Sequence, residues 1–372
     1  MDSLFEDEEK LLMKIVHIAS VIDRMTEQFA GGRGRATYLL AKKQAKEGHD
    51  VTVISAPNSQ IDGCLSVSFI DPPRMSGIYV LDWFHRRIKE TIHAVKAYSW
   101  LETDYEIVHN HVEYEGVGFS FLTKTPCITT LHGPIYSGYG QIPTRLYALP
   151  TRSKFIAYSK QAYAQFKRIY GRDLIGQIYG GIDVEVFPFV SEPDRFCDFQ
   201  FCYVGRIVPV KGVHIAIEVV DRLKEKGYNV HLKVLGSYSP TRYFYSILHE
   251  IEKRPYVSFE VDARTPEVAW QLGNSDALLF PIRWEEVFGR VMIESMSCGT
   301  PIIAYNRGST SEILRDGVTG FLCENINEMT EKMTRVHNLN RKECRKTVEK
   351  EFTMDVVYRN HLEIYKKVID LN

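Results

Sequence analysis

Two glutamates eight positions apart, Glu286 and Glu294, lie in a segment whose residue types suit the binding of a charged sugar compound. A helix is predicted to begin at Gly289, so the first amide N–H groups, those of residues 289–291, have no partner within the helix. A helix start of this kind suits a diphosphate, because the N–H groups and the positive dipole end face the anion. Glu294 can accept hydrogen bonds from ribose hydroxyls, and Glu286 can meet sugar hydroxyls from the preceding loop. The donor-binding residues predicted in this segment are Glu286, Phe288, Gly289, Arg290, Val291 and Glu294.

Two cations, Arg206 and Lys211, lie where a predicted strand ends and a helix begins. A guanidinium and an ammonium at this point can neutralise a diphosphate as a glycosidic bond breaks, without a metal ion. Taken alone, these residues also fit a structural interpretation. Glu286 would then cap the helix, Glu294 would be solvated, and the two cations would be exposed in a loop.

The amino-terminal half offers two further features, a glycine pair before a helix and a histidine at a strand end. Gly31 and Gly32 allow a backbone to approach phosphate or sugar closely. His132 ends the predicted strand Thr129–His132, at the strand end where α/β folds bind ligands. Glycine turns are common, however, and a single histidine is more often packed in a core or exposed at the surface.

The elements that position these residues alternate between strand and helix in two stretches. Continuous apolar strands of this kind suit parallel sheets covered on both faces. The first stretch has a helix at Arg35–Glu47 and strands at Lys14–Ser20, His49–Ala56, Leu65–Ile70, Tyr105–His111, Cys127–His132, Lys154–Ser159 and Gln177–Gly181. The second has a helix at Gly212–Lys226 and strands at Phe201–Arg206, Asn229–Gly236, Val257–Val261, Ala277–Pro281 and Pro301–Tyr305. The final ~45 residues show only helical patterning.

Composition narrows the class of protein. The 46 lysines and arginines nearly balance 47 acidic residues, which argues against a nucleic-acid binder. The seven cysteines are scattered without a C-x-x-C pair, which favours reduced thiols over a zinc site or a disulfide framework. No apolar run reaches the ~18–20 residues that span a bilayer, and the first residues are acidic, unlike a signal peptide. We therefore expect a cytoplasmic protein.

A basic stretch, residues 141–172, contains seven cations and no acidic residue. It suits an anionic acceptor or the inner face of an acidic membrane, although a solvated helix face explains it as well. Within it, Tyr163, Phe166 and Tyr170 have helical spacing, which favours core packing over a sugar platform.

The segment Trp284–Pro301 resembles the E-x7-E signature of the family-four retaining glycosyltransferases. Three other segments match motifs of that family: G-R-x4-K-G at Gly205, Arg206, Lys211 and Gly212, G-G-x-x-R at Gly31, Gly32 and Arg35, and the active-site histidine at His132. The chain departs from the family at Val287, where proline is usual, and at Gly180, where an interdomain asparagine is usual. Arg307–Glu312 resembles the family's G-G-x-x-E. Its loop amides would contact the donor, or Ser309 and Glu312 would cap a helix.

The resemblance implies a GT-B fold, an α/β architecture of two Rossmann-like, doubly wound parallel-sheet domains that face each other across a cleft. Residues 1–13 would form an acidic tail, with Met13 an alternative start. Residues 14–188 would form the acceptor domain, 189–197 a linker, 198–352 the nucleotide-sugar domain, and 353–372 a helix packing back on the first domain.

The implied activity is transfer of a hexose, with retained configuration, from a UDP-, GDP- or ADP-sugar to a carbohydrate, lipid-linked or small-molecule acceptor. His132, Glu286, Arg206 and Lys211 would be the catalytic residues, with Gly31 and Gly32 completing the donor site. No D-x-D triplet is present, so we expect no metal and no other cofactor. Other activities on this fold remain open: a nucleotide-sugar epimerase, a phosphorylase, or a pseudoenzyme that binds a sugar nucleotide without turnover.

Overall fold

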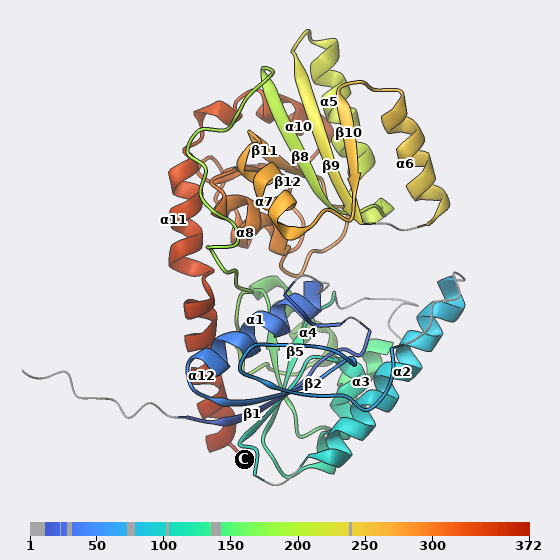
Figure 1. The fold of residues 1–372 in the computed structure, drawn as a ribbon, viewed down its shortest axis with the longest axis vertical. Helices are drawn as coiled ribbons and strands as arrows, with labels where there is room; N and C mark the ends of the chain where they lie inside the picture. Colours follow the sequence, from blue (N-terminus) through green and yellow to red (C-terminus); the bar gives the residue numbers. More distant parts are fainter. Residues whose placement is uncertain are drawn as a thin grey trace, which may run out of the picture. The chain divides into compact units, whose positions relative to one another are not determined.

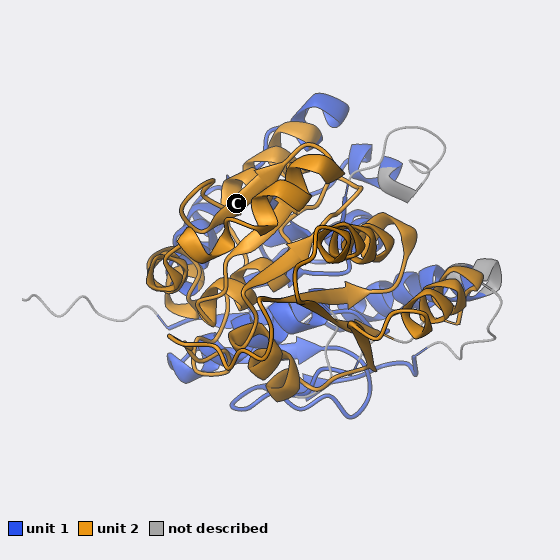
Figure 2. Cartoon of the chain, turned by 90° about the horizontal axis from the view of Figure 1, so that it is seen from above, with its two compact units in different colours: residues 1–157, 166–176, 358–372 blue, residues 158–165, 177–357 orange. Residues whose placement is uncertain are grey.

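The computed structural model describes residues 12–22, 24–27, 32–72, 79–101, 104–134, 143–237 and 240–372, so Gly31 and most of the acidic tail lie outside the described residues. The chain divides into two compact units (Figure 2). Unit 1 comprises residues 1–157, 166–176 and 358–372, and unit 2 comprises residues 158–165 and 177–357. The expected linker 189–197 falls within unit 2, and most of the last helix, α12 (Met354–Asp370), falls within unit 1.

Unit 1 is built on a parallel sheet with the strand order β3-β2-β1-β4-β5-β6-β7. Its strands are β1 (Lys14–Ile18), β2 (Asp50–Ile54), β3 (Leu65–Val67), β4 (Ile107–Asn110), β5 (Cys127–Leu131), β6 (Lys154–Ala157) and β7 (Gly176–Gln177). Its helices are α1 (Gly32–Lys46), α2 (Tyr79–Trp100), α3 (Tyr114–Val117), part of α4 (Lys160–Tyr170), the 3₁₀ turns Gly118–Leu122 and Pro143–Ala148, and the end of α12. Because the strand order reverses between β1 and β4, their carboxyl ends form the switch point at which such sheets bind ligands.

Unit 2 repeats this plan with the strand order β10-β9-β8-β11-β12-β13. Its strands are β8 (Phe199–Arg206), β9 (Val230–Ser237), β10 (Val257–Val261), β11 (Ala277–Phe280), β12 (Ile302–Tyr305) and β13 (Gly320–Cys323). Its helices are α5 (Val213–Glu225), α6 (Arg242–Glu252), α7 (Thr265–Gly273), α8 (Arg290–Ser297), α9 (Thr310–Ile313), α10 (Ile326–Met333) and α11 (Arg341–Glu351), with 3₁₀ turns at Pro209–Lys211 and Val336–Asn338. The switch point of this sheet lies between β8 and β11.

The core of unit 2 explains why its strands are apolar without alternation. Helices α5 and α6 contact β9 and β10 (Figure 1), so the strands are covered and their side chains are removed from water. Phe201, Leu232 and Leu279 are fully buried in this core. Unit 1 has a corresponding core around Val16, Ile54 and Val108, among others.

The predicted set of strands needs one correction, because β13 was missed. This strand has only four residues and begins with a glycine, so it lacks a readable apolar run. A Cβ at Gly320 would lie 2.1 Å from the carbonyl oxygen of Ile302, so only glycine allows the strand to approach β12 so closely.

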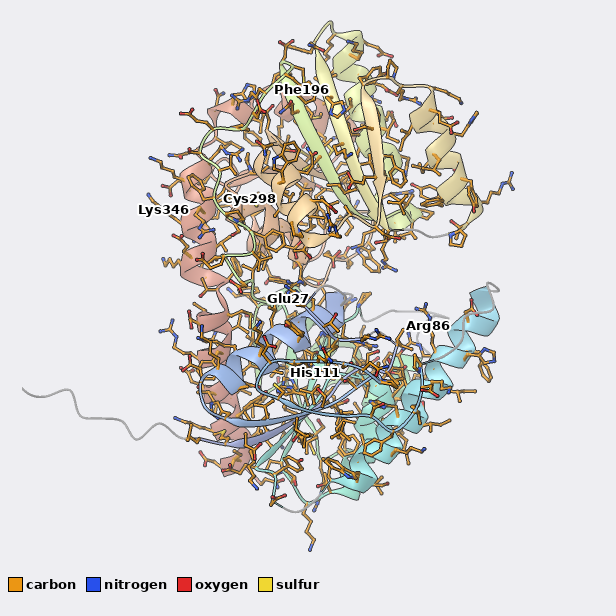
Figure 3. The ribbon with its side chains drawn as sticks, in the orientation of Figure 1. Glu27, Arg86, His111, Phe196, Cys298 and Lys346 are labelled. Carbon is orange, nitrogen blue, oxygen red and sulfur yellow. The ribbon has the colours of Figure 1, made fainter. Side chains whose placement is uncertain are left out.

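Predictions about the cysteines, the aromatic residues near Phe166 and membrane-spanning segments can be compared with the structure. All seven cysteines lie in described residues and none forms a disulfide; Cys298, for example, is buried in unit 2 (Figure 3). Phe166 is fully buried and packs against Phe155 and Tyr170, which confirms core packing for that aromatic. Among the described residues, none of the helices is both long and apolar enough to cross a bilayer.

Within the basic stretch, at least three of the seven cations have structural partners among the described residues. Arg152 donates to the carbonyl of Thr123, Arg172 donates to those of Tyr147 and Leu149, and Lys167 pairs with Asp173 at 2.6 Å. These contacts favour a structural role for the three side chains, and binding of an anion or a membrane by the stretch stays a prediction.

Candidate functional site

Helix α8 begins where the sequence predicts, immediately after Gly289. This glycine has φ 73° and ψ 63°, in the left-handed region that favours glycine, and it occupies the N-cap position. No side chain caps the helix start. The amides at the beginning of α8 therefore lack intrahelical acceptors, as an anion-binding helix start requires.

Glu286 lies in a compact cluster with a cation and an indole. Its Oε2 accepts hydrogen bonds from Lys211 Nζ at 2.7 Å and from Trp284 Nε1 at 3.0 Å. The Lys211 ammonium also lies 4.7 Å from the centroid of the Trp284 ring, a cation–π geometry. Glu286 is buried and the lysine side chain is mostly so. The structure thus brings together Glu286 and Lys211, and adds Trp284, to which the sequence assigned no role.

The loops that carry these residues are held together by backbone contacts. The amide of Arg283 donates to the carbonyl of Val210 at 2.8 Å. Gly212 has φ 77°, and a Cβ there would lie 2.0 Å from the carbonyl oxygen of Pro281. Val210 and Gly212 lie in the loop that follows β8, and Pro281 and Arg283 lie in the loop that follows β11. Strands β8 and β11 are neighbours at the switch point of the sheet. The position matches the general site for ligands in open α/β sheets.

Arg290 connects Glu294 to a neighbouring turn. Its guanidinium donates to the carbonyl of Gly181 at 3.0 Å and to Glu294 Oε1 at 3.4 Å. Glu294 is therefore held by a cation one helical turn earlier, while Val291 between them is half-buried. Arg206 is exposed, and its main-chain carbonyl accepts a hydrogen bond from Tyr203 Oη at 3.1 Å.

Phe288 has a structural role that the sequence did not reveal. Its side chain is buried and stacks on Tyr179, with Tyr158 and Phe352 also in ring contact. A Cβ at Gly180 would lie 2.7 Å from the Phe288 ring, which explains why a glycine stands where the family has asparagine. Any contact of Phe288 with a donor would therefore come from its backbone.

The segment Arg307–Glu312 differs from both interpretations of its sequence. Ser309 occupies the N-cap position of α9, but its backbone (φ −78°, ψ 0°) is not in the extended conformation that capping residues usually adopt, and its hydroxyl makes no cap bond. Its amide donates to the carbonyl of Glu286 at 2.8 Å. The amide of Gly308 donates to Glu285 at 3.0 Å, so neither amide is left for a diphosphate. Glu312 instead accepts from the amides of Lys160 and Gln161, both at 2.8 Å. The segment therefore supports the Glu286 loop and the start of α4. The helix begins after Ser309 as predicted, but the predicted cap by the Ser309 side chain is absent.

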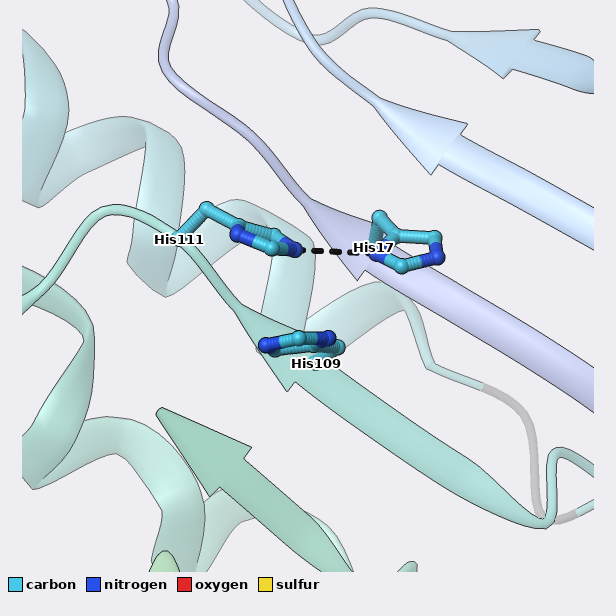
Figure 4. Close-up of side chains that lie close together, drawn as sticks. All are labelled: His17, His109 and His111. Atoms are coloured by element: carbon cyan, nitrogen blue, oxygen red, sulfur yellow. Dashed lines mark hydrogen bonds between the residues drawn. The ribbon is translucent and has the colours of Figure 1, made fainter. Parts of the chain in front are cut away.

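In unit 1, His132 follows β5 and is joined to other histidines. Its Nε2 lies 3.0 Å from Nδ1 of His111, and Nε2 of His111 lies 2.9 Å from Nδ1 of His17 (Figure 4). His17 lies on β1 and His111 directly after β4, the two strands at the switch point. Burial is the main cause that lowers the pKa of His132 well below its ordinary value, so its imidazole is neutral near pH 7. Gly32 begins α1, and a Cβ there would meet no atom within 4 Å.

His17, His109 and His111 form a group whose ligand atoms lie within 4.8 Å of one another, a spacing compatible with a metal ion. Each of their ring nitrogens, however, already has a hydrogen-bond partner. The partners of His109 are Tyr365 and Thr130, both at 2.6 Å. A metal ligand must offer a free lone pair, so this set fits a hydrogen-bonded network better than a metal centre.

Two known families match the chain, one in each half. Residues 30–186 match the family described as Glycosyltransferase Family 4, and residues 196–352 match Glycosyl transferases group 1. The chain belongs to glycosyltransferase family four. It is 25% identical to the glycogen synthase of Mycobacterium tuberculosis over 79% of this chain and 78% of that protein. It is 27% identical to the D-inositol 3-phosphate glycosyltransferase of Paenarthrobacter aurescens over 59% of this chain and 60% of that protein.

Solved structures confirm the GT-B fold of this glycosyltransferase. Sucrose-phosphate synthase from Thermosynechococcus elongatus superposes with a TM-score of 0.77 at 16% identity, over 96% of this chain and 99% of that chain. Anabaena HepE, solved in complex with UDP-glucose, superposes with a TM-score of 0.72 at 18% identity, over 95% of this chain and 100% of that chain. At these identities the likeness establishes the fold alone.

Three residues of the glycosyltransferase that are linked to the predicted site residues were not found from the sequence: Trp284 contacts Glu286, His111 contacts His132, and His17 contacts His111. Trp284, His17 and His111 were missed because an isolated tryptophan or histidine carries no spacing signal. The available signal was positional and applied to His111, which ends the predicted strand Tyr105–His111 as His132 ends its own; His17 lies in the middle of the predicted strand Lys14–Ser20.

The stability of the glycosyltransferase should fall as the pH is lowered from about 7.5 to about 5. Burial lowers the pKa of His17 to about 4 and holds the pKa of His109, His111 and His132 well below the ordinary value, so these imidazoles are neutral in the folded protein. In the unfolded chain they bind protons below about pH 6.5. The unfolded state therefore gains more protons as the pH falls from about 6.5 toward about 4, and the free energy of unfolding decreases.

One carboxyl group opposes this trend. Burial raises the pKa of Glu115 to about 7. Protonation of this carboxyl group therefore stabilises the folded protein as the pH falls from about 7 toward the ordinary pKa of a glutamate. Four histidines outweigh one carboxyl, so the melting temperature measured by scanning fluorimetry should still drop, and a His17→Asn variant should show a shallower slope. A melting temperature that is constant or rises over this interval would contradict the prediction.

Proposed function

We propose that this glycosyltransferase transfers a hexose from a nucleoside-diphosphate sugar to an acceptor hydroxyl, with retained configuration and without a metal ion. The observation that carries the proposal is the Lys211–Glu286–Trp284 cluster beside the start of α8, at the switch point of unit 2. The names of its relatives agree with this class of donor. HepE is solved with UDP-glucose, and a starch synthase of the same fold is solved with ADP and acarbose.

The donor's diphosphate would lie between the cations and the helix start. Arg206 is exposed at the end of β8, and Lys211 lies in the loop that follows, which contacts the loop after β11 through Val210 and Arg283. In our proposal both cations reach an anion at the amides of residues 289–291. Glu294 would accept hydrogen bonds from the ribose hydroxyls. These contacts neutralise charge that develops on the diphosphate as it leaves, which is where such contacts accelerate the reaction.

Glu286 would bind the transferred sugar. A diphosphate competes with Glu286 for the ammonium of Lys211, which frees carboxylate lone pairs for sugar hydroxyls while Trp284 Nε1 continues to donate. A buried carboxylate without a partner is costly, so this exchange makes donor binding depend on a sugar with correctly placed hydroxyls. Glu286 thereby contributes to specificity for the sugar.

The chemical step requires no enzyme nucleophile. The bond between the anomeric carbon and the phosphate oxygen breaks, and the acceptor oxygen forms the new bond on the same face of the sugar. The acceptor's proton passes to an oxygen of the departing phosphate, so charge and atoms balance. The roles predicted for His132, Gly31 and Gly32 remain predictions. The free thiols of all seven cysteines suit a reducing compartment, and we propose the cytoplasm.

A donor panel tests this function. The glycosyltransferase is incubated with UDP-, GDP- or ADP-glucose, with glycogen or an inositol phosphate as acceptor, and with or without excess chelator. Release of the nucleoside diphosphate from one donor, unchanged by chelator, with the α-linkage of the donor kept in the product, is the expected result. Loss of activity in chelator that Mg²⁺ or Mn²⁺ restores would disprove metal independence. An epimerised donor, or binding without release, would replace the transferase with the epimerase or pseudoenzyme alternatives.

A further inference from the structure

A chain of four side chains crosses the interior of unit 1 and ends at His132. Gln44 Oε1 lies 2.6 Å from His17 Nε2, and from there the contacts continue through His111 at 2.9 Å to His132 at 3.0 Å. Gln44 and His17 are fully buried, and His111 is 1% exposed. Figure 3 shows His111 among the side chains of unit 1, and Figure 4 shows its contact with His17. Each contact must therefore be satisfied within the protein.

The glutamine sets the direction of the first hydrogen bond. Its Nε2 donates to the hydroxyl of Tyr365 at 3.2 Å, so its carbonyl oxygen is the atom that faces His17. A carbonyl oxygen can only accept a hydrogen bond. His17 must therefore carry a hydrogen on Nε2.

Because each histidine ring is neutral, the position of the hydrogen on one ring determines its position on the next. Burial lowers the pKa of His17 and His111, so each ring has one N–H and one lone pair. With its hydrogen on Nε2, His17 accepts at Nδ1 from Nε2 of His111. His111 in turn accepts at Nδ1 from Nε2 of His132. With the glutamine in this orientation, only one arrangement of the three ring hydrogens satisfies these three contacts.

We propose that Gln44, acting through His17 and His111, fixes His132 in the tautomer with hydrogen on Nε2 and a lone pair on Nδ1. The three are positioning residues, because they act on His132 and on no substrate atom. The predicted active-site histidine thus presents an acceptor rather than a donor at Nδ1 and cannot supply a proton from that atom. The catalytic consequence rests on the proposed function, whereas the tautomer itself does not.

The remaining histidine of the group provides a control. His109 contacts Tyr365 through Nδ1 and Thr130 through Nε2. The Tyr365 hydroxyl also accepts from Gln44, whereas the Thr130 contact lies outside the chain from Gln44 to His132. Thr130 is fully buried, and valine has nearly its shape. A Thr130→Val change removes one hydrogen bond of a neighbouring buried histidine and leaves the chain to His132 intact.

Nitrogen-15 NMR of histidine-labelled full-length protein reads the tautomer directly, since two-bond couplings distinguish protonated from unprotonated ring nitrogens. The His132 signals are identified by their loss in a His132→Asn variant. The proposal expects hydrogen on Nε2 and none on Nδ1 of His132 near neutral pH. Hydrogen on Nδ1, or on both nitrogens, would overturn it. The spectrum requires no substrate, so this result stands apart from the outcome of the donor panel.

Two variants distinguish the effect of hydrogen-bond direction from the effect of side-chain packing. Gln44→Leu removes the acceptor, so His132 should show a mixture of tautomers, and turnover should fall by about tenfold. His17→Asn keeps an acceptor oxygen near the position of Nδ1, so it should preserve the tautomer of His132, as Thr130→Val should. Unchanged His132 couplings in Gln44→Leu would disprove the role of the glutamine. If that variant does not fold, the wild-type spectrum still decides the tautomer of His132.

Discussion

Replacing Lys211 with methionine should lower kcat/KM for transfer by about 10²–10³-fold. The change removes a cation that we place on the departing diphosphate, and it also leaves the buried carboxylate of Glu286 with only the Trp284 indole as a donor. The effect on kcat should exceed the effect on KM, because charge on the diphosphate grows as the glycosidic bond breaks. Steady-state kinetics with the preferred donor measure both.

A matched control for this change is Lys233→Met. Lys233 pairs with Glu260 at 2.9 Å in the same unit, so the control removes the same charge and breaks a similar ion pair, but on β9 and β10. It should change kcat/KM by less than about twofold, since partly exposed ion pairs contribute little. Equal losses in the two variants would show that Lys211 acts through the overall charge or stability of unit 2 rather than at a donor site.

Gly212→Ala should strongly destabilise unit 2. Its φ of 77° costs an alanine about 1–2 kcal/mol, and the new Cβ would lie 2.0 Å from the carbonyl oxygen of Pro281, a backbone atom that cannot rotate away. Together the two effects should lower the free energy of unfolding by about 3 kcal/mol or more. For a unit of this size that corresponds to a fall of about 6–12 °C in melting temperature.

Gly227, at the other end of the same helix, provides the comparison. It has φ 90°, but a Cβ there would meet no atom within 4 Å. Gly227→Ala should therefore cost only the backbone strain of about 1–2 kcal/mol and leave transfer intact. Similar melting temperatures for the two variants would mean that the loops after β8 and β11 do not need the close approach seen at Gly212.

The sequence predicted the architecture well because buried parallel strands form continuous apolar runs. All the strands except β13 overlap their predicted ranges, and the start of α8 falls at the predicted glycine. Gly212 and Gly289 were chosen as parts of motifs, and the structure gives each a physical reason in its left-handed φ. Val287, the departure from the family's proline, is buried in the loop beside Glu286.

Side-chain partners were much less predictable. The sequence placed Glu286 and Lys211 in one site but did not reveal that they pair, because their separation of 75 positions carries no pattern. Phe288 was predicted to contact the donor because it belongs to the motif; its side chain packs against Tyr158 and Tyr179 from distant segments, which the sequence did not reveal. Glu312 satisfies the start of α4 rather than that of its own helix. Such contacts depend on which loops meet in space, and local periodicity does not encode that.

The central claim is that unit 2 binds a nucleoside diphosphate through its two cations and the start of α8. Isothermal titration calorimetry of UDP, GDP and ADP into the full chain, and into the Arg206→Ala/Lys211→Met double variant, tests it most directly. We predict that at least one of the three nucleotides binds the wild-type protein and that its affinity falls by at least about tenfold in the double variant, as expected when charged contacts to phosphate are removed. Absence of binding by all three nucleotides, or equal affinity in the double variant, would contradict the claim.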